Sequence, residues 1–316
     1  MPMVSETAAE WGYVSGRCAS LEGSLLDAGF FRDLLRARTA AEAHALLSKT
    51  TYAGLFPNPA TLEAYDRLLK GHFREGLHSL QAGSPPHSPM EIPLREMELQ
   101  EVHELLTRQG IARASGDEVE RWAARLGGGF PWLGGFAVSA ERRALFASQP
   151  VRALSLWVDA AYLAEMIALA AVQPGLSPFI EAMVSLTALK VCWRAFRGGL
   201  GVDWLDGFFF RAPLPVPPMK ALAAAGREKS PGALVKLLGP PDFAPPMDEF
   251  AETFGREADD YLTRIARRGA YEVCGVGRVL CYTRRLWVEQ FNLRLCCATV
   301  LTPLDRRQAR ERLRSG

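Results

Sequence analysis

The chain has 316 residues, of which 48% are hydrophobic and 23% are charged, and its formal net charge is +2 at pH 7. This balance excludes global disorder and a fibrous repeat, and it disfavours nucleic-acid binding, which requires a concentrated basic surface. Ala, Leu, Arg and Glu dominate, whereas alternating runs of Val and Ile are nearly absent. The sequence therefore predicts an all-α fold.

Residues 1–10 lack a basic region followed by an apolar core, so the sequence predicts no secretory signal and a protein that begins in the cytosol. Apolar residues over 15–35 recur at spacings of three and four, which predicts a helix with one buried stripe of Cys18, Leu21, Leu25, Leu26 and Phe30. Thr39 followed by Glu42 is a capping-box pattern and predicts a helix over 40–48.

The most apolar segment, 153–172, is long enough to span a membrane but carries Asp159 and Glu165. Two carboxylates inside a bilayer are costly, so we expect a buried core helix and no transmembrane segment. Pro- and Gly-rich breaks should end helices and form ordered loops packed on them, at 84–89, 127–135, 212–218 and 239–246.

Cysteine and histidine are the residues most often used in metal sites, and their spacing here matches no such site. Six scattered cysteines in a chain of this length predict reduced, buried side chains: Cys18, Cys192, Cys274, Cys281, Cys296 and Cys297. The five histidines lack His-x-x-x-His spacing and are interpreted as solvated surface groups. The sequence predicts no catalytic, cofactor or metal residues, since phosphate-loop and nucleophile-elbow patterns are also missing from it.

An internal repeat is visible at a shift of 191 residues. The shift aligns 97–103 with 288–294 and 46–52 with 237–243. It also brings Asp66 close to the acidic pair that follows residue 258. This third match needs a slip of two or three residues, and three matches make coincidence less likely than two.

A degenerate middle copy lies at 184–190, and Asp159 precedes it as Asp66 precedes the first copy. Each copy combines an acidic helix, a loop and a Leu-basic helix. We therefore predict three related helical modules, the second of them degenerate and the third with a basic C-terminal helix, at 1–110, 111–210 and 211–316.

Asp259 and Asp260 offer an enzymatic alternative, because all-α prenyl-diphosphate enzymes hold magnesium with an Asp-Asp-x-x-Asp run. The fifth residue here is Thr263, and no second acidic cluster is evident. We favour salt bridges from the acidic pair to nearby arginines, namely Arg256, Arg264 or Arg267.

Two polar features near the end of the sequence allow two interpretations each. Glu289 and Asn292 share a helix face and are interpreted as a buried packing contact, with contact to a partner as the alternative. The segment 306–314 is basic, with Asp305 near its start. It is interpreted as a solvated helix, with docking onto acidic partner helices or anionic lipid as the alternative.

The opening of the chain, over 13–27, 31–35 and 50–52, resembles that of the C-type subunits of the V/A-type (vacuolar/archaeal-type) ATPases, which correspond to the d-type subunits of the eukaryotic proton pump. The helix over 287–294 resembles that family's Glu-x-x-Asn-Leu-Arg helix. The middle copy departs from the pattern, with Ser185 and Ala188 in place of the acid and the amide. The residues that carry the resemblance are Tyr13, Arg17, Leu21, Glu22, Tyr52, Glu289, Asn292 and Arg294.

This resemblance implies a funnel of three helical modules around a pseudo-threefold axis. In that family the mouth receives the rotor shaft and the underside sits on the proteolipid ring. The implied role is a non-catalytic, cofactor-free part of the central stalk, peripheral on the cytoplasmic face of the membrane, that couples ATP hydrolysis to proton or sodium transport. The choice of ion belongs to the ring carboxylates of another chain.

Overall fold

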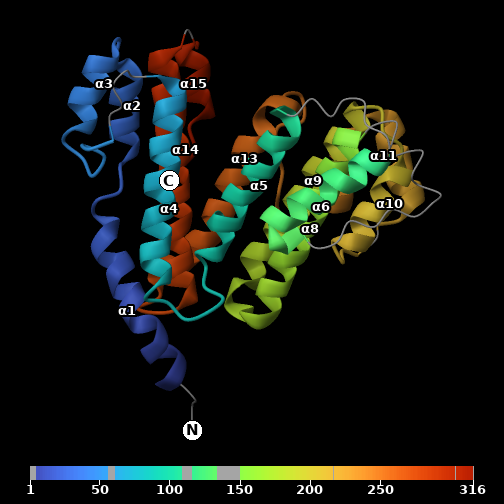
Figure 1. The fold of residues 1–316 in the computed structure, drawn as a ribbon, viewed down its shortest axis with the longest axis horizontal. Helices are drawn as coiled ribbons and strands as arrows, with labels where there is room; N and C mark the ends of the chain where they lie inside the picture. The colour runs from blue at the N-terminus through green and yellow to red at the C-terminus, as the bar shows by residue number, and fades with distance from the viewer. Residues whose placement is uncertain are drawn as a thin grey trace. The chain divides into compact units, whose positions relative to one another are not determined.

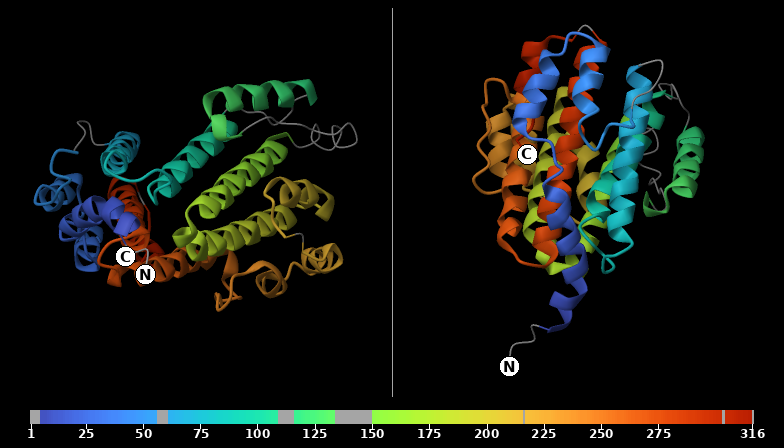
Figure 2. Two further views of the ribbon diagram at one scale, coloured as in Figure 1. Left: turned by 90° about the horizontal axis from the view of Figure 1, so that it is seen from below. Right: turned by 90° about the vertical axis from the view of Figure 1, so that its left-hand side faces the viewer.

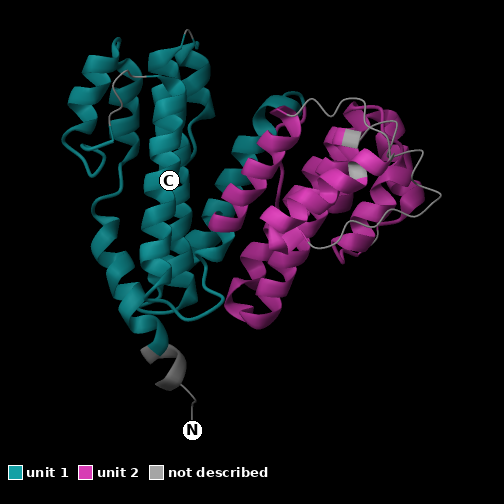
Figure 3. Cartoon of the chain, in the orientation of Figure 1, with its two compact units in different colours: residues 1–93, 248–316 teal, residues 94–247 magenta. Residues whose placement is uncertain are grey.

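The computed structural model describes residues 5–55, 61–108, 116–133, 150–215, 217–302 and 304–315. Within these ranges every regular element is a helix, which confirms the predicted all-α class (Figure 1). The chain divides into two compact units, unit 1 with residues 1–93 and 248–316 and unit 2 with residues 94–247 (Figure 3). The three modules and their funnel arrangement stay predictions.

Unit 1 is built around α14 (Val276–Leu301), a helix of 26 residues. The other helices of the unit contact it, and Figure 2 shows the early and late parts of the chain side by side. These neighbours are α1 (Ser5–Glu22), α2 (Ala28–Arg36), α3 (Ala40–Leu47), α4 (Leu62–Gln81), α13 (Phe250–Ala266), the 3-10 turn η4 (Arg267–Tyr271) and α15 (Arg306–Arg312). Because α14 is covered on several sides, it buries polar as well as apolar residues.

One apolar cluster of unit 1 joins segments from opposite ends of the sequence. Its buried members come from α2, α3, α4, α14 and α15, and they include Phe31, Leu34, Leu47, Leu69, Leu293 and Ala309. Each fully buried Leu or Phe contributes about 1.5–3 kcal/mol relative to an exposed one. The cluster therefore fixes the N-terminal helices on α14.

The single helix predicted over 15–35 is wrong. α1 ends at Glu22, and α2 begins at Ala28. Asp27 starts the second helix, because its Oδ1 accepts a hydrogen bond of 2.7 Å from the backbone N–H of Phe30. Of the predicted stripe, Cys18 is fully buried, whereas Leu21, Leu25, Leu26 and Phe30 are partly buried.

The capping prediction for α3 is confirmed, with one difference. Thr39 Oγ1 accepts from the N–H of Glu42 at 3.2 Å, as predicted. The Glu42 carboxylate instead accepts from the N–H of Arg38 at 2.7 Å, one residue before the N-cap. The Thr39 contact satisfies a donor that the helix start leaves unpaired, and the Glu42 contact pairs the N–H just before the N-cap.

Unit 2 is centred on two long apolar helices that pack together, α8 (Pro150–Val172) and α9 (Ser177–Arg197), joined by the short 3-10 turn η3 (Pro174–Leu176). Fully buried Leu154, Leu163 and Leu189 lie in them. The remaining elements, of which the first begins in unit 1, are α5 (Glu91–Arg108), α6 (Gly116–Gly129), η2 (Pro131–Leu133), α10 (Val202–Arg211), α11 (Met219–Glu228) and α12 (Pro231–Leu238).

α8 is the core helix predicted for the most apolar segment. By length and composition alone, Val151–Val172 and Pro174–Arg197 could cross a membrane, and 56% and 61% of these windows are buried inside the structure. The core helix of a soluble protein has the same length and composition. The two helices are therefore weak evidence for a membrane span.

Three of the four predicted breaks fall between helices, at 84–89, 212–218 and 239–246. The break at 127–135 is misplaced, because α6 continues to Gly129; residues 134 and 135 lie outside the described residues. Glycine weakens a helix by about 1 kcal/mol but does not forbid it. Trp132, Leu133 and Phe243 are buried, so these loops pack as predicted.

The cysteines are free, and five of the six are buried as predicted. Cys274 is the exception and is partly exposed. Burial raises the pKa of the Cys18 and Cys297 thiols to about 12. These thiols are therefore protonated at neutral pH and act as small apolar groups.

Candidate functional site

Four of the residues singled out in the sequence lie on α1, and three of them contact its neighbours in unit 1. Arg17 donates to the backbone oxygen and the hydroxyl of Ser79, both at 2.7 Å. Glu22 accepts from Arg278 at 2.6 Å. Tyr13 is exposed, but its ring lies so close to Gly83 that a Cβ there would approach it to 2.5 Å, and Leu21 is partly buried. These contacts hold α1 against α4 and α14.

Glu289 and Tyr52 meet inside unit 1. One Glu289 oxygen accepts from the Tyr52 hydroxyl and the other from the N–H of Leu26. Gln290 Nε2 donates to the Tyr52 oxygen at 2.8 Å. Burial raises the pKa of Glu289 to about 7, although both donated hydrogen bonds oppose this shift. The pKa of Tyr52 is also raised, mainly by burial and secondly by the nearby Glu289 carboxylate.

Asn292 and Arg294 leave the same helix in different directions. The Asn292 side chain is buried and makes two hydrogen bonds to the backbone of Arg314, at 2.9 Å and 3.1 Å. Arg294 Nε donates to Asp66 on α4 at 2.6 Å, and Lys70 pairs with the same carboxylate at 3.1 Å. Glu289 and Asn292 are thus buried packing contacts, the interpretation favoured from the sequence.

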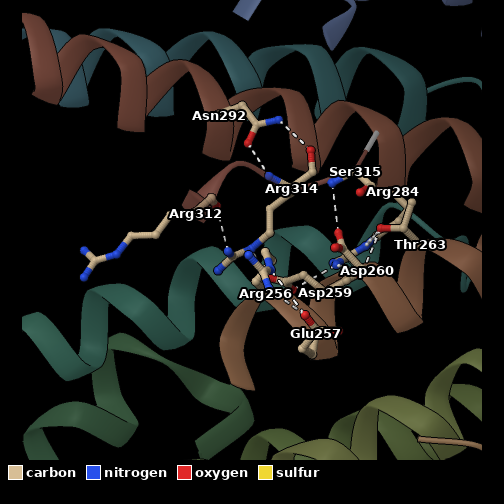
Figure 4. Close-up of polar contacts among 10 residues, drawn as sticks. All are labelled: Arg256, Glu257, Asp259, Asp260, Thr263, Arg284, Asn292, Arg312, Arg314 and Ser315. Carbon is tan, nitrogen blue, oxygen red and sulfur yellow. Dashed lines mark hydrogen bonds and ion pairs between the residues drawn. The ribbon is translucent and has the colours of Figure 1, made fainter. Parts of the chain in front are cut away.

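Figure 4 shows the acidic pair on α13, Asp259 and Asp260, among its polar partners. Asp259 accepts from Arg284 Nη2 at 2.9 Å and, on its other oxygen, from Arg314 Nε at 2.7 Å. The Arg284 side chain is only 5% exposed and also donates to Thr263 Oγ1 at 3.2 Å. Both Asp259 oxygens therefore accept hydrogen bonds from guanidinium groups.

Arginine pairing was predicted for this cluster, and Asp259 pairs with two arginines that were not among those predicted, Arg284 and Arg314. Arg256 pairs with Glu257 at 2.8 Å, and Arg264 lies over the Tyr261 ring at 5.0 Å. The sequence pattern considers only neighbours on the same helix, whereas α14 and the segment after α15 supply the partners of Asp259. Among the described residues, no group of three or more His, Cys, Asp or Glu side chains is placed to hold a metal ion.

Asp260 differs from Asp259 in having a backbone partner. Its Oδ1 accepts from the N–H of Ser315 at 2.8 Å. Partial burial raises the pKa of its carboxyl group, while the Ser315 hydrogen bond and the charge of Arg314 act in the opposite direction.

The segment after Thr302 behaves differently from a solvated tail. Asp305 caps α15 by accepting from the N–H of Arg307 at 2.8 Å, and most of the helix is exposed, as expected. The Arg314 side chain, however, is only 10% exposed and packs on the chain's own α13 and α14. The sequence carries no local signal for this contact, because its partners are 22 and 55 residues away.

Unit 2 contains a second buried acid, Asp159 on α8. It accepts from His103 Nε2 at 2.9 Å and from Arg194 Nη2 at 2.7 Å. Burial acts to raise the pKa of Asp159, but the His103 hydrogen bond and the charges of His103, Arg194 and Lys190 outweigh it and lower the pKa. The prediction of a solvated imidazole is wrong for His103, because it pairs with this acid.

Ser155 adds the third residue type of a hydrolase triad, with its Oγ 3.3 Å from His103 Nδ1. A working triad also needs donors for an oxyanion, and Ser155 lies inside α8, where backbone N–H groups serve the helix. Asp159 is moreover shared with Arg194. We therefore interpret this cluster as a packing contact between α5, α8 and α9.

Comparison with known proteins assigns the chain to no family. No protein-family model matches the chain, and no curated protein matches it significantly. The resemblance to a part of the rotary ATPases therefore rests on the residues quoted for it.

Proposed function

We propose that this chain is a non-catalytic coupling component of the central stalk of a V/A-type rotary ATPase. In this role it joins the rotor shaft to the membrane proteolipid ring, on the cytoplasmic face. ATP hydrolysis by the soluble head then drives proton or sodium transport through the ring. The chain acts as a mechanical socket and needs rigid helices and broad contacts instead of a reactive group.

The observation that carries the proposal is a pair of equivalent contacts. His103 and Arg294 occupy the same position in the 191-residue repeat. His103 binds Asp159, the acid of the second predicted module, and Arg294 binds Asp66, the acid of the first. His103 of the first predicted module thus binds the acid of the second, and Arg294 of the third predicted module binds the acid of the first. Contacts of this kind between successive modules support the proposed arrangement of three modules.

The third acid departs from this rule, since Asp259 binds Arg284 and Arg314. The third predicted module also contains the segment 313–315, which hydrogen-bonds to α13 and α14. The repeat therefore accounts for two of the three acids, and the third serves a local contact of unit 1.

The magnesium-enzyme alternative is disfavoured by the environment of Asp259. Magnesium binding requires free carboxylate oxygens in octahedral geometry, and here arginines occupy both. Calorimetric titration with Mg²⁺ and a diphosphate analogue is expected to give no saturable micromolar binding. Saturable binding that Asp260→Ala abolishes would favour the enzyme over the coupling role.

Reconstitution tests the coupling role directly. In complexes assembled without this chain, ATP hydrolysis by the soluble head is expected to persist while ion transport through the ring stops, because no part transmits torque. Adding the chain back should restore ATP-driven ion uptake into vesicles, and ring-only vesicles serve as the control for leak. Fully coupled transport in complexes shown to lack the chain contradicts the proposal.

A further inference from the structure

The segment 313–315 lies in a polar site on α13 and α14 that we call the arginine socket. The socket consists of Asp259 and Asp260 on α13 and of Asn292 on α14 (Figure 4), together with Phe291 on α14. Leu313, with φ −57° and ψ 139°, leads the chain out of α15 in an extended conformation. Its side chain packs against the apolar cluster of unit 1.

The socket binds the backbone of this segment at two successive residues. Asn292 Oδ1 accepts from the N–H of Arg314 at 2.9 Å, and its Nδ2 donates to the Arg314 carbonyl at 3.1 Å. Asp260 then accepts from the N–H of Ser315 at 2.8 Å. An amide that satisfies both polar groups of one residue recognises an extended peptide of any sequence.

The socket also recognises the side chain between these backbone contacts. Arg314 Nε donates to Asp259 Oδ2 at 2.7 Å, and its guanidinium carbon lies 4.2 Å from the centre of the Phe291 ring. Lysine cannot reproduce this combination, because it lacks the planar group that pairs with a carboxylate while stacking on a ring. The site therefore selects arginine.

The occupant is held in a way that permits exchange. α15 has only seven residues and one buried residue, Ala309. Outside the socket, 306–315 is held by the Leu313 side chain on the apolar cluster and by two hydrogen bonds, from Arg306 to the Ala37 carbonyl and from Arg256 to the Glu311 carbonyl. Asp259 remains paired with Arg284 when Arg314 leaves, and no buried charge is orphaned. Short elements with few buried contacts open at low free energy.

We propose that the arginine socket is a peptide-binding site for an extended, arginine-containing segment of a partner protein, with 313–315 as its intramolecular occupant. A partner segment competes with 313–315 for Asn292, Asp259 and Asp260. This proposal goes beyond the coupling role and stands without it, since it concerns contacts within unit 1.

Fluorescence anisotropy with a labelled, end-capped peptide of the sequence Arg-Glu-Arg-Leu-Arg-Ser tests the proposal. The full chain carrying Arg314→Ala is expected to bind this peptide saturably. The wild-type chain should bind at least roughly tenfold more weakly, because a tethered competitor acts at about millimolar effective concentration. Replacing the arginine that precedes Ser in the peptide with lysine should weaken binding roughly tenfold.

The controls separate socket binding from general attraction of a basic peptide. The double variant Arg314→Ala/Asn292→Ala is expected to lose binding. Because Asn292 is buried and its loss can unfold the chain, Arg314→Ala/Asp260→Ala is the second test, and it should bind the peptide severalfold more weakly than Arg314→Ala alone. A peptide of the same net charge in which all three arginines are replaced with lysine should bind at least roughly tenfold more weakly. Failure of the Arg314→Ala chain to bind, equal binding by the wild type, or equal binding of the all-lysine peptide overturns the proposal.

Discussion

Replacing Asp259 by alanine is expected to lower the free energy of unfolding by about 3 kcal/mol, at the lower end of the roughly 3–5 kcal/mol measured when one partner of a buried ion pair is removed. The Arg284 side chain is 5% exposed and would stay buried without a countercharge. Its remaining acceptors are the Thr263 hydroxyl and the Asp259 backbone oxygen, which limit the loss. Urea unfolding followed by circular dichroism measures the change.

Asp260→Ala is the matched control for this prediction. Asp260 is the next residue on the same helix, and its side chain has a backbone N–H partner instead of a buried arginine. Its removal is expected to lower the free energy of unfolding by about 1 kcal/mol or less. Equal losses for the two variants, or no loss for Asp259→Ala, would show that Arg284 does not depend on Asp259.

Local signals in the sequence predicted local structure well. The helix at α3 follows from Thr39 and Glu42, since both partners of the cap lie within four residues. The break before α2 was missed although Asp27 is also a local cap. The apolar spacing across 15–35 continues through the break, so periodicity outweighed the Gly-Ser-Leu-Leu-Asp run that ends one helix and caps the next.

Long-range partners could be predicted only where the repeat relates them. The position of His103 is linked to that of Arg294 by the 191-residue shift, and both bind acids. The shift therefore indicated that His103 binds an acid, which the spacing of the histidines did not indicate. Arg284 and Arg314 have no counterpart in that repeat, and helix spacing pointed to nearer arginines. Their pairing with Asp259 depends on how α13, α14 and the last segment pack.

The stability of the chain is expected to fall by about 3 kcal/mol between pH 4.5 and pH 7 on account of Glu289 alone. Burial raises the pKa of this carboxyl group from 4.5 to about 7. Between these values the folded chain holds a proton that the unfolded chain has released, so the free energy of unfolding decreases as pH rises and levels off above pH 7. Each unit of pKa difference corresponds to about 1.4 kcal/mol.

Glu289→Gln isolates this contribution, because glutamine has no proton to lose and keeps an oxygen for the N–H of Leu26. The difference in unfolding free energy between wild type and Glu289→Gln, measured in urea from pH 4.5 to 8, should follow the predicted fall. Tyr52→Phe supplies the opposite test. It removes a donor that lowers the pKa of Glu289, so the fall should extend above pH 7. A difference that is flat with pH for Glu289→Gln would mean that burial does not govern this carboxyl group. A window that Tyr52→Phe moves to lower pH would mean that the Tyr52 hydrogen bond does not lower its pKa.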